Sequence, residues 1–167
     1  MQHIGIYSGT FDPVHVGHIA FATEAQRAAK LDRVVFMPET QPRGKTGVMD
    51  IQERVNLLHA QLAGTNHTIY QARHPRFTIA ETLPELLQEY PDARLSFLMG
   101  SDIVLSLHKW PDIEQLLAEA QLIVGMRGSD NLEAITSLLS DLGARHLIVT
   151  TPHAHISSRQ IRQSVHS

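Results

Sequence analysis

Short apolar runs alternate along the chain with longer segments in which apolar residues recur every three or four positions. The short runs predict strands at 4–7, 33–37, 68–71, 94–99, 122–126 and 146–150. The longer segments predict helices that start near Val16, after a capping Asp50, at Thr78, at Ile113, at Leu132 and at Ser157. Pro84 lies inside the third of these helices, so we expect a kink or a later start there.

This alternation of strand and helix predicts parallel strands joined by crossover helices. The expected fold is α/β, with a Rossmann-like open parallel sheet flanked by helices on both faces. The chain of 167 residues shows no internal repeat and no dividing linker, so we expect a single domain over residues 1–167.

Composition narrows the possible functions. Hydrophobic residues make up 43% of the chain and charged residues 19%, which is typical of a globular protein. A net charge of −3 lacks the basic field of a nucleic-acid binder, so no nucleic-acid partner is expected and any anion site is local. The absence of cysteine excludes disulfides, thiolate zinc sites and cysteine nucleophiles, and no metal site is predicted.

Neither a membrane partner nor secretion is expected. No apolar run reaches the roughly 18 residues of a membrane span, and the N-terminus lacks the pattern of a secretory signal. A cytoplasmic protein is therefore expected, and a homo-oligomer is possible.

The strongest local motif is the stretch from Ser8 to His18, which follows the first predicted strand and opens the first helix. Ligands of open parallel sheets bind beyond the carboxyl ends of the strands, and a helix N-terminus suits phosphate. Gly9 and Gly17 would let the backbone approach a ligand. His15 and His18 are three residues apart, so both could donate hydrogen bonds to one phosphoryl group.

A second motif lies near the C-terminus, at Ile156-Ser157-Ser158-Arg159-Gln160-Ile161-Arg162. Its serines are natural helix caps, and Arg162 could fork onto phosphate oxygens. Together, this segment and His15-Val16-Gly17-His18 resemble the signatures of the His-x-Gly-His nucleotidylyltransferase superfamily.

The intervening segments resemble the bacterial nicotinate mononucleotide adenylyltransferase family. The similar segments are Gln41-Pro42-Arg43-Gly44-Lys45, Gln52 to Leu58, Arg76 to Leu83, Phe97 to Asp102, Trp110, and Leu122 to Arg127. The chain departs from the family pattern at Arg43 and Gly44, which stand where proline and histidine are usual, and at Gly128, which stands where proline is usual.

The resemblance implies transfer of AMP from ATP to nicotinate mononucleotide, forming deamido-NAD and pyrophosphate in NAD biosynthesis, with Mg²⁺ carried by ATP. It implies that His15 and His18 are catalytic. It assigns ATP binding to Ser8, Gly9, Thr10, Phe11, Gly17, Gly100, Asp102, Ile156, Ser157, Ser158 and Arg162. It assigns the acceptor to Lys45, Thr78, Trp110 and Arg127.

Several alternatives stay open. The acceptor could be nicotinamide mononucleotide or phosphopantetheine, or the chain could be a nucleotide-binding module without catalysis. Trp110 could instead pack in the core, Asp102 could cap a turn, and Thr78 could cap its helix.

Overall fold

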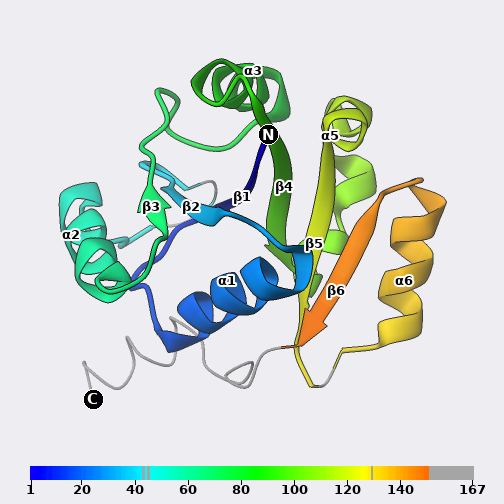
Figure 1. The fold of residues 1–167 in the computed structure, drawn as a ribbon, viewed down its shortest axis with the longest axis horizontal. Helices are drawn as coiled ribbons and strands as arrows, with labels where there is room; N and C mark the ends of the chain where they lie inside the picture. The colour runs from blue at the N-terminus through cyan, green and yellow to red at the C-terminus, as the bar shows by residue number, and fades with distance from the viewer. Residues whose placement is uncertain (43, 45, 129, 151–167) are drawn as a thin grey trace.

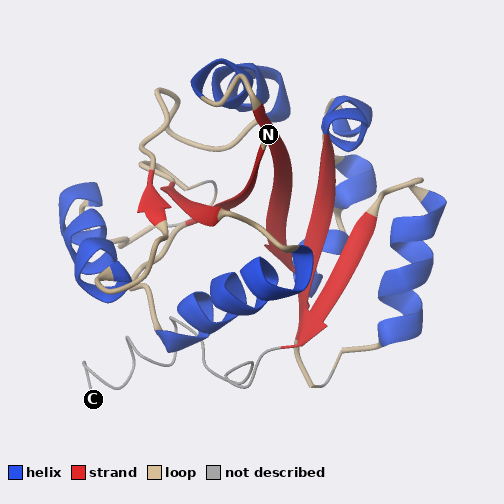
Figure 2. Ribbon diagram, viewed as in Figure 1, coloured by secondary structure: helices blue, strands red, loops and turns tan. Residues whose placement is uncertain are grey.

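The computed structural model describes residues 1–42, 44, 46–128 and 130–150. These residues form one sheet of six parallel strands surrounded by helices (Figures 1 and 2). The strands are β1 (Gln2–Gly9), β2 (Arg33–Pro38), β3 (Thr68–Ile69), β4 (Ala93–Gly100), β5 (Ala120–Met126) and β6 (His146–Thr150). The helices are α1 (Val16–Ala29), α2 (Ile51–Leu62), α3 (Ile79–Glu89), α4 (Ser101–Val104), η1 (Leu107–Lys109), α5 (Ile113–Glu119) and α6 (Leu132–Asp141).

The strand order is β3-β2-β1-β4-β5-β6, the order of a Rossmann-type sheet. The chain runs outward from β1 to β3, crosses back over the sheet, and continues from β4 to β6. The direction of winding therefore reverses between β1 and β4, which pair in register from Gln2 opposite Ala93 to Tyr7 opposite Leu98. This reversal opens a crevice beyond the carboxyl ends of these two strands.

Side chains of the sheet alternate between two hydrophobic cores. In β2, Val34 and Phe36 pack with residues of α1 and α2, whereas Val35 and Met37 pack with residues of α3, α5 and α6. Because helices cover both faces, the strand is apolar at consecutive positions. The predicted Rossmann-like sheet flanked by helices on both faces is confirmed.

The element boundaries differ from the sequence-based prediction in a few places. Helix α3 begins at Ile79, capped by Thr78, and continues past Pro84 to Glu89, so the later start is wrong. The turn of helix at α4 and the short η1 were not predicted. The helix predicted from Ser157 lies outside the described residues.

Candidate active site

The two histidines of the first motif cap helix α1 together. His15 is the N-cap residue, and its Nδ1 accepts a hydrogen bond from the backbone N–H of Gly17 at 3.0 Å. The backbone N–H of His15 donates in turn to Nδ1 of His18 at 3.1 Å. The two rings stack, with centroids 3.8 Å apart and an interplanar angle of 29°. A neutral ring whose Nδ1 accepts a hydrogen bond carries its proton on Nε2, so this cap makes each ring an Nε2–H donor.

His15 is held in its neutral form. Its side chain is buried, and the guanidinium of Arg127 acts on it as a like charge. Burial first, and Arg127 second, lower the pKa of His15 to about 4. At neutral pH the ring is therefore uncharged, and it can offer its Nε2–H as a hydrogen-bond donor without adding a full charge.

Phe11 shapes the loop between β1 and α1. It is buried and adopts a φ of 50°, in the left-handed region that residues other than glycine rarely occupy. Its ring meets those of Tyr7 and His18 edge-on, at centroid distances of 5.2 and 5.1 Å. A Cβ at Gly9 would lie 3.1 Å from the same ring. In the structure, the absence of a side chain at Gly9 thus makes room for the ring of Phe11.

The end of β4 brings a carboxylate to the crevice. A Cβ at Gly100 would lie 2.7 Å from Oδ1 of Asp102, so glycine lets the exposed carboxylate fold back over the strand end. Burial, together with the charge of Asp102, raises the pKa of Tyr7, while Arg127 acts in the opposite direction. Asp102, which follows β4, and Arg127, which follows β5, thus both affect the pKa of Tyr7 in β1.

Asp130 holds the turn that carries Arg127. Its Oδ2 accepts the backbone N–H of Arg127 at 2.7 Å and also accepts the hydroxyl of Ser101. Both hydrogen bonds favour the ionised form, and they lower the pKa of Asp130. The backbone at Arg127 is therefore fixed to the start of α4, while its side chain stays exposed.

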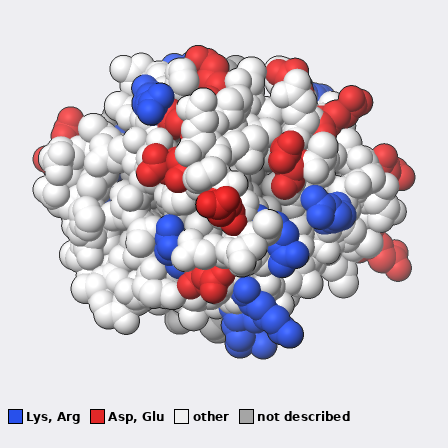
Figure 3. All heavy atoms as spheres, turned by 45° about the horizontal axis from the view of Figure 1, so that its top comes forward, with Lys and Arg blue, Asp and Glu red and all other residues white. Residues whose placement is uncertain are grey.

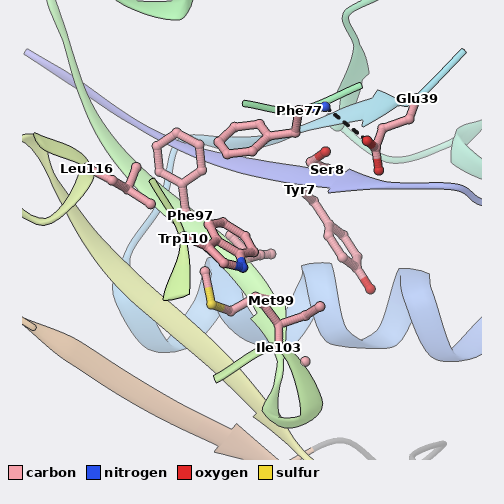
Figure 4. A pocket seen from close by; sticks show the side chains of 11 residues that line it. Tyr7, Ser8, Glu39, Phe77, Phe97, Met99, Ile103, Trp110 and Leu116 are labelled. Atoms are coloured by element: carbon pink, nitrogen blue, oxygen red, sulfur yellow. Dashed lines mark hydrogen bonds between the residues drawn. The ribbon is translucent and has the colours of Figure 1, made fainter. Parts of the chain in front are cut away.

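A pocket of about 220 Å³ opens between the ends of β1 and β4. Tyr7, which lines it, meets the ring of His18 with centroids 6.1 Å apart. Figure 4 shows the rings of Phe77, Phe97 and Trp110 gathered along it, with Tyr7 and Ser8 opposite. Trp110 is partly buried, and its ring centroid lies 6.1 Å from that of Phe77. The indole thus packs against the core and also lines the pocket, which suits a flat ring.

Thr78 lies at the rim of a neighbouring hollow of about 590 Å³, which shares Phe77 and Trp110 with the first pocket. Its hydroxyl accepts the backbone N–H of Glu81 at 3.3 Å, so Thr78 caps α3. Capping was one of the two roles expected for Thr78, beside binding of the acceptor. The remaining predicted residues, Lys45, Ile156, Ser157, Ser158 and Arg162, lie outside the described residues.

The sequence-based prediction did not include Arg54 and Glu39 among the site residues. Arg54 is only 1% exposed and donates to backbone carbonyls around the site. It shares the buried stripe of α2 with Leu58 and Leu62 at a spacing of four, a signal that the sequence does contain. His67 is also buried, and its Nδ1 accepts the backbone N–H of Val34 at 3.3 Å.

Charges are dispersed over the protein surface seen in Figure 3, where acidic and basic side chains are interspersed. Within the described residues, no three histidine or acidic side chains gather in a way that could hold a metal ion. No helix in this part of the chain is long and apolar enough to span a membrane.

Comparison with known proteins assigns the chain to a family. Residues 6–164 match the family model described as "Cytidylyltransferase-like". The chain is 32% identical to a "Probable nicotinate-nucleotide adenylyltransferase" of Gloeobacter violaceus, over 98% of this chain and 84% of that protein. A protein with the same description from Carboxydothermus hydrogenoformans is 33% identical, over 97% of this chain and 85% of the relative.

A solved structure shares the fold. The nicotinic acid mononucleotide adenylyltransferase of Plasmodium falciparum, complexed with NaAD, superposes with a TM-score of 0.80 at 19% identity, over 98% of this chain and 83% of that one. With a family match along nearly its whole length and relatives above 30% identity, the chain belongs to the cytidylyltransferase-like family and, within it, to the nicotinate-nucleotide adenylyltransferases.

Proposed function

We propose that this protein transfers the adenylyl group of ATP to nicotinate mononucleotide, forming deamido-NAD and pyrophosphate in NAD biosynthesis. The observation that carries the proposal is the stacked His15–His18 pair, which caps α1 at the sheet reversal beside an aromatic pocket. The named relatives support the same reaction.

In this reaction a phosphate oxygen of the acceptor attacks the α-phosphorus of ATP. A new P–O bond forms, the bond from the α-phosphorus to the bridging oxygen breaks, and pyrophosphate leaves with the electron pair. Because the nucleophile is already an anion, no strong general base is needed, and catalysis consists of positioning and charge stabilisation. His15 and His18 supply Nε2–H donors for the phosphoryl oxygens, next to the N-terminal end of α1.

The other residues hold the two substrates. The ATP side comprises the loop from Ser8 to Phe11, Gly17, Gly100 and Asp102, and the acceptor side comprises Thr78, Trp110 and Arg127. Lys45 is proposed to bind the acceptor phosphate. Ser157, Ser158 and Arg162 are proposed to bind the departing phosphates, and Ile156 is proposed to contribute to ATP binding. Mg²⁺ is proposed to arrive on the ATP phosphates, as it commonly does in phosphoryl transfer.

The substrates suggest a cytoplasmic protein, and we expect no membrane or nucleic-acid partner. A homo-oligomer also remains an expectation. Light scattering coupled to size-exclusion chromatography measures that state directly.

The test of the function is pyrophosphate release from Mg-ATP in the presence of one acceptor at a time. We expect release with nicotinate mononucleotide and little with nicotinamide mononucleotide or phosphopantetheine. Release with one of the other two would keep the mechanism and replace the acceptor. ATP binding without release in any mixture would instead support a nucleotide-binding module.

A further inference from the structure

The guanidinium of Arg54 is almost fully buried, with 1% of the residue exposed, and donates four hydrogen bonds to backbone carbonyls. Nε donates to Met49 at 2.8 Å, Nη1 to Thr10 at 2.8 Å and to Glu39 at 2.7 Å, and Nη2 to Thr40 at 3.1 Å. Hydrogen bonds from a charged donor are among the strongest in proteins, and a planar guanidinium fixes the directions of all four.

The four carbonyls belong to three segments around the crevice. Thr10 lies in the loop after β1, which precedes the histidine pair. Glu39 and Thr40 follow β2, and Met49 precedes α2. These segments meet through one side chain, although Thr10 and Arg54 are 44 positions apart in the sequence.

Glu39 extends this connection into the aromatic pocket. Its backbone N–H donates to the carbonyl of Gly9 at 2.9 Å, and its carboxylate Oε2 accepts the backbone N–H of Phe77 at 2.9 Å (Figure 4). Phe77 in turn packs against Trp110. A continuous path of contacts therefore runs from Thr10 through Arg54, Glu39 and Phe77 to Trp110.

We propose that Arg54 is a positioning residue that sets the ATP-side loop and the acceptor pocket in one common geometry, with Glu39 carrying this geometry to the pocket wall. The proposal rests on the proposed adenylyl transfer. All four hydrogen bonds go to backbone carbonyls, so Arg54 acts on the substrates through Thr10 and Glu39. Disturbing Arg54 changes both substrate sites, whereas disturbing the Glu39 carboxylate changes only the acceptor site.

Arg54→Lys is the first test because it keeps the charge. One ammonium nitrogen cannot reproduce four hydrogen bonds that leave from three nitrogens in a plane. We expect the KM values for ATP and for nicotinate mononucleotide each to rise about tenfold, and kcat to fall about tenfold, since small misplacements of reacting groups are costly. Arg27→Lys is the matched control: Arg27 is exposed on α1 and pairs with Glu24, and all three constants should stay at wild-type values.

Two further variants separate positioning from general stability. Arg54→Ala assayed with and without added guanidinium ion should regain activity in its presence, while guanidinium should not stimulate wild type. Glu39→Ala should raise the KM for the acceptor and leave that for ATP within twofold. Glu39→Gln, which keeps an oxygen to accept the Phe77 N–H, should restore the acceptor KM.

Binding measurements keep this test distinct from that of the proposed function. Trp110 is the sole tryptophan, so its fluorescence reports the acceptor, and calorimetry with a non-hydrolysable ATP analogue reports the ATP side. An absence of turnover in the wild-type protein would contradict the proposed function. The dissociation constants for the acceptor and for the ATP analogue would still test the role of Arg54. A folded Arg54→Lys with both constants within twofold of wild type, or with only one changed, overturns the proposal. So does a finding that neither Arg54 variant folds, because Arg54 would then serve stability alone.

Discussion

The Nδ1 atoms of His15 and His18 both accept backbone N–H groups of the same helix turn, and their rings stack 3.8 Å apart. One helix cap thus sets the tautomer and the orientation of both side chains before a substrate binds. Because the donors are already fixed, the proposed reaction requires little reorganisation as negative charge develops on the phosphate.

Removing one of these donors should slow the chemical step. We expect His18→Ala to lower kcat by roughly 10²–10³, the usual cost of deleting one preorganised donor to a transition-state oxygen. Steady-state pyrophosphate release measures this, and circular dichroism establishes that the variant is folded. A folded His18→Ala that retains near wild-type kcat would remove His18 from the catalytic assignment.

The depressed pKa of His15, about 4, should make folding stability depend on pH. The unfolded chain takes up a proton on this ring near its ordinary pKa of 6.5, whereas the folded chain does so only near 4. Stability from this group is therefore complete above pH 6.5 and falls as the pH is lowered from 6.5 to 4.

His15→Asn tests this dependence, because asparagine still caps a helix but does not titrate. Urea unfolding at pH 7 and pH 5 should show a smaller acid-induced loss in the variant than in wild type. The other histidines are common to both proteins, so the difference between them isolates His15. Equal losses in the two proteins would mean that His15 titrates normally, and an NMR titration of its ring would then show a midpoint near 6.5.

Trp110 should report the acceptor. Because its indole lines the aromatic pocket, Trp110→Ala should raise the KM for nicotinate mononucleotide more than the KM for ATP. Trp110→Phe, which keeps a flat ring, is the matched comparison. Its KM for nicotinate mononucleotide should lie between the values of wild type and Trp110→Ala. An unchanged acceptor KM in a folded Trp110→Ala would leave the indole with core packing alone.

Gly100→Ala should separate the position of Asp102 from stability. The new methyl group would displace the Asp102 carboxylate, which is the flexible end of an exposed side chain, so we expect Tm to change by only a few degrees. The KM for ATP should nevertheless rise severalfold if Asp102 contacts the nucleotide. Gly128→Ala, where a Cβ meets nothing within 4 Å, is the control. A wild-type KM in Gly100→Ala would argue that Asp102 does not bind ATP.

The sequence predicted the strands and the histidine pair because both depend on local patterns. Val34 to Met37 form an apolar run that any parallel sheet requires, and His15 and His18 lie at helical spacing after a strand. The spacing of Arg54 along α2 agrees with burial, but the role of its guanidinium could not be assigned from local patterns. Its four acceptors are backbone carbonyls, which have no signature in side-chain identity, and they come from segments that only the folded chain brings together.

Glu39 and Asp130 show the same limit. Each carboxylate accepts a backbone N–H, Glu39 from Phe77 and Asp130 from Arg127, so its role depends on where loops meet. In the sequence, both look like ordinary polar loop residues. The double role of Trp110, in the core and on the pocket wall, likewise follows from its place between two loops.

The pairing of β1 with β4 also bears on how the protein is made. Gln2 finds its partner Ala93 only after 91 further positions, so the central pairing closes a long loop at an entropic cost that nearby pairings do not have. A ribosome releases the N-terminal segment first. The nascent chain therefore carries β1 with one side unpaired until β4 emerges.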